Sequence, residues 1–241
     1  MSMILSTLHR RGATLSVVVA NTLRERQGVQ RLRHQIYVRE MGLLAQDHPF
    51  VRGDRLVDPF DDWSTHIVGL VNGEPVGTVR VTEALDGPLE LEEYTDVRSA
   101  LPEGARPAEL TRYMVRRDHR RTAVGPLVLY GAFLVIARSA STHLTAAAKE
   151  GSLGTYYRSA GLRVIDDEPF TYGLTGCRYV LGAIDCGAPG SLRRTLMKTW
   201  YGALRLGAGQ TAAVENLLFR RRLRPGRPVA PATERIEEQA A

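Results

Sequence analysis

An Asn-Gly turn between two apolar runs is the sequence feature that most constrains the fold. Residues 66–71 (His-Ile-Val-Gly-Leu-Val) precede Asn72-Gly73, and residues 76–81 (Val-Gly-Thr-Val-Arg-Val) follow it. Both turn positions require positive φ, which Asn and Gly adopt most readily, so this pattern is a strong signal for a β-hairpin. Residues 66–82 are therefore predicted to form an antiparallel pair of strands, with Pro75 acceptable near the strand start.

The flanking segments alternate between helical and strand patterns. Apolar residues recur at helical spacing from Thr22 to Tyr37, and a second helix is predicted from Pro126 to Ala140, because proline is favourable at the first helical position. The acidic stretch 91–99 is also helix-like. Further elements are predicted as strands at 15–20, 108–116, 143–148, 162–165 and 177–184, and as a short helix at 152–160. This order predicts an α/β (α+β) fold, a mixed sheet with helices on both faces.

The chain divides into three predicted segments. Residues 1–188 are long enough for one domain with a proper core. Residues 189–224 are predicted to form a basic helical extension, in which Leu192, Leu196 and Trp200 recur every four residues with basic residues between them. This extension packs on the core or contacts a membrane surface or carrier protein. Residues 225–241 contain three prolines and are expected to be a disordered tail.

Composition narrows the class of protein. Hydrophobic residues make up 44% of the chain and charged residues 24%, which is ordinary for a globular protein. The net charge of +6 is compatible with a solvated basic surface or with an acidic partner, such as a phosphate-bearing cofactor or a carrier protein. The two cysteines are too far apart on one predicted strand to form a disulfide, and the six histidines show no metal-ligand spacing. We expect a cytoplasmic protein without a metal and without a nucleic-acid partner.

Charged residues occur where strands are predicted to begin or to be buried. Arg80 lies between Val79 and Val81, and arginine rarely enters such an apolar run without a carboxylate. The available carboxylates are Asp58, Asp61 and Glu109. We expect an ionic cluster at one end of the sheet, which is either purely architectural or part of a site for a charged substrate.

A second cluster of signals runs from Glu109 to Gly125. An apolar strand is followed by a basic turn that contains Arg116, Arg120 and Arg121, and then by the predicted helix. Backbone N–H groups and the dipole at a helix N-terminus attract anions, so this stretch is predicted to seat a phosphorylated cofactor.

These residues together resemble a known family. The series Asp58-Pro-Phe-Asp61, Gly77-Thr-Val-Arg80 and Glu109-Leu-Thr-Arg112 is similar to motifs of the acyl-homoserine-lactone synthases and of the long-chain N-acyl amino acid synthases. Both groups belong to the GNAT acyltransferase superfamily, and the similarity covers roughly residues 25–185. It implies a GNAT-like, mostly antiparallel central sheet. It also implies that the acceptor substrate is bound by residues on the first helix, the following loop and the hairpin: Arg33, Tyr37, Asp58, Asp61 and Arg80.

The resemblance also implies an activity and roles for several residues. The protein would be an N-acyltransferase that uses acyl-CoA or an acyl carrier protein as donor and attacks the thioester directly with a small amine. Glu109 is the first candidate for the base, with Arg112 beside it. Tyr157 matches the tyrosine that protonates the leaving thiolate. The donor would be held by residues after the central strand, with a backbone N–H near Met114 and Val115 binding the oxyanion: Met114, Val115, Arg116, Arg120, Arg121 and Gly125.

One departure from the motifs concerns the acceptor. The lactone synthases carry a tryptophan shortly after the helix, where S-adenosylmethionine is received, but this chain has residues 41–44 (Met-Gly-Leu-Leu) there. An amino acid or another amine is therefore favoured as acceptor. The alternatives are an autoinducer synthase that uses S-adenosylmethionine, and a non-catalytic GNAT-fold protein that binds an anion or contacts the inner membrane peripherally through its basic helix.

Overall fold

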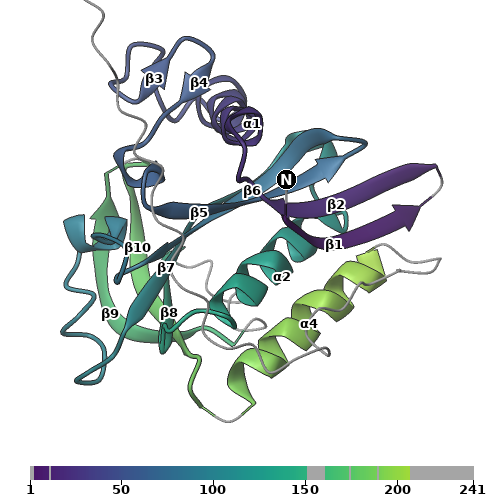
Figure 1. Ribbon diagram of the computed structural model, residues 1–241. Helices are drawn as coiled ribbons and strands as arrows, with labels where there is room; N and C mark the ends of the chain where they lie inside the picture. The colour runs from purple at the N-terminus through teal and green to yellow at the C-terminus, as the bar shows by residue number, and fades with distance from the viewer. Residues whose placement is uncertain (1–2, 11, 151–160, 174, 189, 207–241) are drawn as a thin grey trace, which may run out of the picture.

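The computed structural model describes residues 3–10, 12–150, 161–173, 175–188 and 190–206. Within these residues, eight strands form one sheet in the order β1-β2-β5-β6-β7-β8-β10-β9 (Figure 1). Their bounds are Met3–Arg10 (β1), Ala13–Val19 (β2), Ser64–Val71 (β5), Glu74–Glu83 (β6), Pro107–Val115 (β7), His143–Lys149 (β8), Arg163–Tyr172 (β9) and Cys177–Asp185 (β10). Two short strands, β3 (Val51–Arg52) and β4 (Arg55–Leu56), form a separate hairpin.

Helices cover both faces of the sheet, as predicted (Figure 1). The helix α1 (Leu23–His34) continues into a π-helical turn, η1 (Gln35–Glu40), and lies on one face. The helices α2 (Val124–Ile136) and α4 (Ser191–Leu206) lie on the other. Three single turns, η2 (Pro59–Asp61), η3 (Glu90–Glu93) and η4 (Arg117–His119), connect the elements. None of the helices in the described ranges is long and apolar enough to cross a bilayer.

The predicted hairpin is confirmed and forms the centre of the sheet. β5 pairs with β6 around Asn72, whose φ of 50° is the conformation that the turn demands. The helix α2 packs closely against this hairpin because two strand residues lack a Cβ. A Cβ on Gly77 would lie 2.7 Å from Val124 Cγ1, and one on Gly69 would lie 2.8 Å from Val128 Cγ2. The main hydrophobic core fills this layer between sheet and helix.

One pair of neighbouring strands runs parallel and is joined over a short length. β7 pairs with β8 only from Pro107 to Glu109, opposite residues 143–145. Residues 110–115 of β7 continue along β6 and are not paired with β8. The sheet is therefore split beyond Glu109, and backbone groups on that side of β7 are left for other partners.

Three predicted elements differ from the structure. The prediction of a helix around residues 91–99 was wrong, since only the η3 turn forms there. Asp96 accepts a hydrogen bond from Ser99 N–H, which favours a local turn over a helix. The helix expected to reach Ala140 ends at Ile136, with Ser139 bonding back to the Ile136 carbonyl. The strand expected at 162–165 extends to Tyr172, because an edge strand tolerates Pro169.

The C-terminal helix packs on the body of the protein. Leu196 is 8% exposed and belongs to the main core cluster, beside α2. Residues 207–224 of the predicted extension, the predicted tail at 225–241 and the predicted helix at 152–160 lie outside the described residues.

Candidate active site

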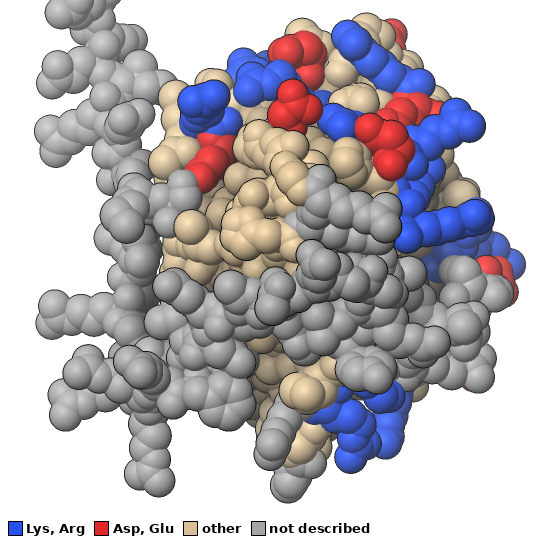
Figure 2. All heavy atoms as spheres, turned by 90° about the vertical axis from the view of Figure 1, so that its right-hand side faces the viewer, with Lys and Arg blue, Asp and Glu red and all other residues tan. Residues whose placement is uncertain are grey.

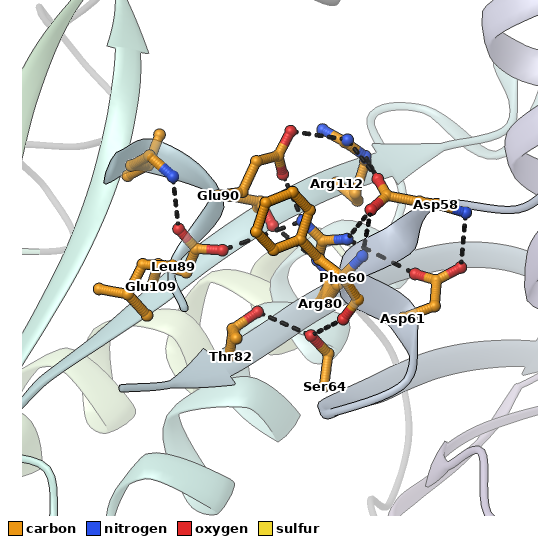
Figure 3. A network of polar contacts seen from close by, with 12 residues as sticks. Asp58, Phe60, Asp61, Ser64, Arg80, Thr82, Leu89, Glu90, Glu109 and Arg112 are labelled. Atoms are coloured by element: carbon orange, nitrogen blue, oxygen red, sulfur yellow. Dashed lines mark hydrogen bonds and ion pairs between the residues drawn. The ribbon is translucent and has the colours of Figure 1, made fainter. Parts of the chain in front are cut away.

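In the described part of the chain, three arginine side chains meet inside the protein. Arg33 lies on α1, Arg80 on β6 and Arg112 on β7, and their exposed fractions are 0%, 0% and 4%. Buried guanidinium groups require carboxylates that neutralise them and accept their hydrogen bonds. Those carboxylates come from η2 and its N-cap, from η3 and from β7 (Figure 3): Asp58, Asp61, Glu90 and Glu109. We call these seven residues the ionic cluster.

Arg33 binds a carboxylate and a histidine. Its Nη1 donates to Asp61 Oδ1 at 2.6 Å, and its Nη2 lies 3.0 Å from His66 Nδ1. Burial and the neighbouring Arg33 lower the pKa of His66 to about 3, so the imidazole is neutral and its Nδ1 accepts from Arg33. The ring proton is therefore on Nε2, which lies 3.6 Å from Asp61 Oδ1.

Arg80 lies at the centre of the ionic cluster (Figure 3). Its Nη1 lies 2.8 Å from Asp58 Oδ1, and its Nη2 forms an ion pair with Glu90. Its Nε donates to Thr111 Oγ1 at 3.0 Å. Glu109 is more distant, with its Oε1 3.9 Å from Arg80 Nη2. The prediction that Arg80 requires carboxylate partners is confirmed.

Arg112 completes the ionic cluster from the next strand. Its Nε donates to Asp58 Oδ2 at 2.9 Å, and its Nη2 lies 2.7 Å from Glu90 Oε1. Its Nη1 donates to the hydroxyl of Tyr172, which itself donates to Glu90 Oε1 at 2.5 Å. Each guanidinium of the cluster thus has at least one ion-pair partner within the protein.

A β-bulge directs Arg112 into the cluster. Between the pairs Thr78–Met114 and Arg80–Thr111, β7 contains one residue more than β6. Arg112 lies in this interval with φ of 52°, a conformation that L-residues other than Asn and Asp rarely adopt. Bulges reorient side chains next to functional sites, and here the bulge turns Arg112 toward Asp58 and Glu90.

The pKa of Glu109 is shifted in the opposite direction from that of Asp58. Burial would raise the pKa of Asp58, but Arg112 and Arg80 lower it below its ordinary value. Burial raises the pKa of Glu109 to about 7 and outweighs the opposite effect of Arg80. Glu109 Oε2 accepts from Leu91 N–H at 2.9 Å, whereas Oε1 has no hydrogen-bond partner among the described residues. Four carboxyls face three guanidiniums here, so the charges balance when Glu109 is protonated.

Some of the arginines in the basic turn before α2 are bound by other groups of the protein. Arg116 Nε donates to Asp118 at 2.8 Å, and Arg120 donates to Glu40 at 3.1 Å and to the Val115 carbonyl at 3.0 Å. By contrast, Arg117 and Arg121 are exposed, and the described part of the chain offers neither an ion-pair partner.

The glycine in the first turn of α2 has a packing role. A Cβ on Gly125 would lie 2.6 Å from the Tyr113 hydroxyl oxygen, so the glycine admits this ring. Val124 N–H bonds only weakly, to Thr122 Oγ1 at 3.3 Å, and no side chain caps the helix at Ala123. Backbone donors at the start of α2 therefore remain for another acceptor.

The structure places the other predicted residues as follows. Tyr37, on η1, is half-buried next to the ionic cluster, and burial raises the pKa of its hydroxyl, opposed by Arg112 and Arg33. Tyr157 lies outside the described residues. The sequence interpretation missed Glu90 and Tyr172. Glu90 stands between Leu89 and Leu91, the same signal of a buried charge that Arg80 gives between two valines.

No group of three or more His, Cys, Asp or Glu residues within the described ranges has the arrangement of a metal site. Nor is the surface uniformly basic. Figure 2 shows basic and acidic side chains intermixed over the upper part of the face that it presents, at the level of α1.

Comparisons with known proteins agree with this geometry. Residues 28–185 match the family described as N-acyl amino acid synthase FeeM. The fold is similar to the solved structure of FeeM, an N-acyl amino acid synthase from uncultured soil microbes, with 17% identity, a TM-score of 0.56, and coverage of 72% of this chain and 91% of that one. No curated protein sequence gives a significant match.

Two acyl-homoserine lactone synthases have a similar fold. BjaI, a CoA-dependent enzyme solved with SAM and isopentyl-CoA, shows 18% identity and a TM-score of 0.55 over 87% of this chain and 92% of its own. LasI shows 18% identity and a TM-score of 0.55 over 82% of this chain and 98% of its own. The matched region includes the split between β7 and β8 and all seven residues of the ionic cluster.

Proposed function

Because the chain belongs to the FeeM family of N-acyl amino acid synthases and is an acyltransferase, we propose that it transfers a long acyl chain from a thioester to the amine of an amino acid or a similar small acceptor. The observation that carries this proposal is the position of Glu109. Its buried carboxyl lies at the last β7–β8 pair, where the sheet splits, and it has an oxygen without a hydrogen-bond partner among the described groups.

Glu109 acts as the base in this proposal. The amine attacks the thioester carbonyl, a C–N bond forms, and the amine proton passes to Glu109 Oε1, directly or through water. A pKa of about 7 suits this task, because a general base works best when its pKa is near the operating pH. Arg80, at 3.9 Å, is too far from Glu109 to hold it firmly ionised.

The oxyanion is stabilised by backbone, and of the two predicted donors we favour Val115. Arg116 N–H donates to the Val76 carbonyl on β6, so alternate residues of this strand, including Met114, face β6. The Val115 carbonyl instead accepts from Arg120, so Val115 faces away from β6 and toward the split. A single oxyanion donor is typically worth about 10²–10³ in kcat.

The leaving thiolate takes its proton from Tyr157 as the C–S bond breaks. This role rests on the family's spacing of tyrosine and glycine alone. We expect Tyr157→Phe to lower kcat while the KM of the acceptor stays within about twofold, because the hydroxyl acts only on the leaving group.

The donor is acyl-CoA or an acyl carrier protein, and Arg117 and Arg121 attract its phosphates in either case. The BjaI structure contains isopentyl-CoA, which supports a CoA-type ligand on this fold. Charge reversal at Arg117 and Arg121 should raise the KM of the donor about tenfold or more, most strongly at low salt. Arg52, exposed on β3, is the matched control. A donor KM that responds equally to Arg52→Glu would contradict this assignment.

A peripheral membrane contact through α4 would fit a lipid product. Met197 is 58% exposed between the exposed Arg194 and Lys198, which favours contact with an anionic surface. Sedimentation with vesicles rich in phosphatidylglycerol should be reduced by Met197→Glu, and unchanged sedimentation would contradict the contact. A cytoplasmic location remains a prediction.

The proposed function is tested with the purified full chain, a mixture of amino acids and amines, and lauroyl-CoA or lauroyl carrier protein. Free thiol release and mass spectrometry should reveal an N-lauroyl product. Addition of S-adenosylmethionine tests the alternative of an autoinducer synthase, since such an enzyme would release methylthioadenosine. Binding of a thioester without any consumption would instead favour a non-catalytic protein.

A further inference from the structure

Tyr172 reaches the ionic cluster from a distant strand. It is the last residue of β9, the edge strand, and β8 and β10 separate β9 from β7 in the sheet order. Its hydroxyl nevertheless accepts from Arg112 Nη1 on β7 and donates to Glu90 Oε1. This bond can form only if the end of β9 and the middle of β7 face the same interior. The separation of β7 from β8 beyond Glu109 allows this arrangement.

The ring of Tyr172 is held independently of its hydroxyl. It is 7% exposed, and its ring centroid lies 4.9 Å from that of Tyr94 and 5.4 Å from that of Tyr179. Aromatic contacts at these distances are stabilising in themselves. Removal of the hydroxyl alone should therefore leave the ring in place and free only its two polar partners.

Glu90 joins two arginines through one carboxylate. Its Oε1 lies 2.7 Å from Arg112 Nη2 and accepts from Tyr172, while its Oε2 pairs with Arg80. The next residue, Leu91, supplies the N–H that binds Glu109. Movement of Glu90 would therefore disturb Arg80, Arg112 and the donor to the proposed base together.

Arg112 needs such restraint. A non-glycine residue with φ of 52° is strained and persists only where its surroundings fix it. Asp58 restrains its guanidinium from one side, and Tyr172 and Glu90 restrain it from the other.

From this geometry we propose that Tyr172 and Glu90 are positioning residues, which fix the Arg112 guanidinium across the split in the sheet and thereby set the geometry of acyl transfer. The part of this inference that concerns catalysis rests on the proposed function. Its structural part concerns Arg112 alone and can be measured without any substrate.

The first experiment measures hydrogen exchange of the Arg112 Nη1–H that binds Tyr172 by NMR, with Tyr172→Phe and Tyr179→Phe as a matched pair. Tyr179 lies on the neighbouring strand and contacts the same ring, and among the described residues its hydroxyl accepts only a 3.4 Å bond from Thr175 Oγ1. We expect exchange of the Arg112 proton to accelerate about tenfold or more in Tyr172→Phe, because a charge-assisted bond is lost, and to change less than twofold in Tyr179→Phe. Unchanged exchange in Tyr172→Phe, or the same acceleration in both variants, overturns the assignment.

The second experiment measures kinetics of the same variants with Glu90→Gln and the double variant Tyr172→Phe/Glu90→Gln. We expect kcat to fall about tenfold in Tyr172→Phe and in Glu90→Gln, with the KM of donor and acceptor within twofold, and to change less than twofold in Tyr179→Phe. The double variant should lose less than the product of the two, because both changes release the same guanidinium. A loss confined to KM, or fully multiplicative losses, overturns the catalytic part. If Tyr172→Phe accelerates the exchange but the wild-type protein consumes no thioester, the structural assignment is supported and the proposed function is contradicted.

Discussion

The raised pKa of Glu109 makes the stability of the protein depend on pH, and Glu109→Gln should remove that dependence. Glutamine has nearly the same shape as a protonated glutamate, and its Oε1 can accept from Leu91 N–H as the carboxyl does. The substitution therefore changes the charge of the side chain and little else.

The magnitude follows from the two pKa values. Below the ordinary value of 4.5, Glu109 is protonated in both the folded and the unfolded protein. As the pH rises, the unfolded chain releases the proton while the folded protein keeps it, so unfolding becomes easier until the folded carboxyl ionises at about 7. A difference of about 2.5 pKa units corresponds to about 3 kcal/mol, and most of it, about 2.5 kcal/mol, develops between about pH 5 and about pH 8. Glu109 is fully buried, so solvent screening does not reduce this figure.

The assay is urea unfolding of wild type and Glu109→Gln at several pH values in that window. The free energy of unfolding of the variant should exceed that of the wild type by an increment that grows with pH to about 2–3 kcal/mol. Other groups titrate equally in both proteins and cancel in the difference. A constant difference across the window, or a variant that becomes less stable relative to wild type as pH rises, would refute the reasoning.

Three further predictions concern the fold and the ionic cluster. Gly77→Ala should destabilise the protein by about 1–3 kcal/mol, because the new methyl group would meet Val124 Cγ1 at 2.7 Å; thermal unfolding measures this. Thr22→Ala should cost about 1 kcal/mol through loss of the N-cap bond from Glu25 N–H, and no loss in chemical denaturation would contradict the capping box. Because the pKa of Asp58 is lowered in the folded protein, its carboxylate stabilises the fold at pH values above its ordinary pKa of 3.8, and this contribution is lost as the pH falls. The free energy of unfolding of Asp58→Asn should therefore be lower than that of the wild type by about 3–5 kcal/mol at neutral pH and by less in acid. Urea unfolding at neutral and at acid pH measures this difference.

Local chemistry made the centre of the fold predictable. The Asn-Gly turn determines a hairpin from residues only a few positions apart, and the buried Arg80 requires a carboxylate whatever the fold. The motif series then identified Asp58, Asp61, Glu109 and Arg112 as its neighbours, and the structure brings all of them together (Figure 3).

The missed residues depend on contacts that sequence spacing does not contain. Glu90 lies in an acidic stretch whose pattern resembled a surface helix, although its position between two leucines was a usable signal. Tyr172 follows the polar residues 166–169 (Asp-Asp-Glu-Pro), which indicate a loop unless the strand is known to be at an edge. Its bond to Arg112 spans 60 residues and depends on the split in the sheet.

The central claim is that the ionic cluster beside the split sheet supports acyl transfer through Glu109. The most direct measurement is kcat for N-acylation by wild type and by Glu109→Gln near pH 8, where the stability assay shows whether the variant is folded. General-base catalysis typically contributes about 10²–10⁴, so we predict a folded variant that is at least about a hundredfold slower. A folded Glu109→Gln protein that transfers the acyl group at the wild-type rate would contradict the account.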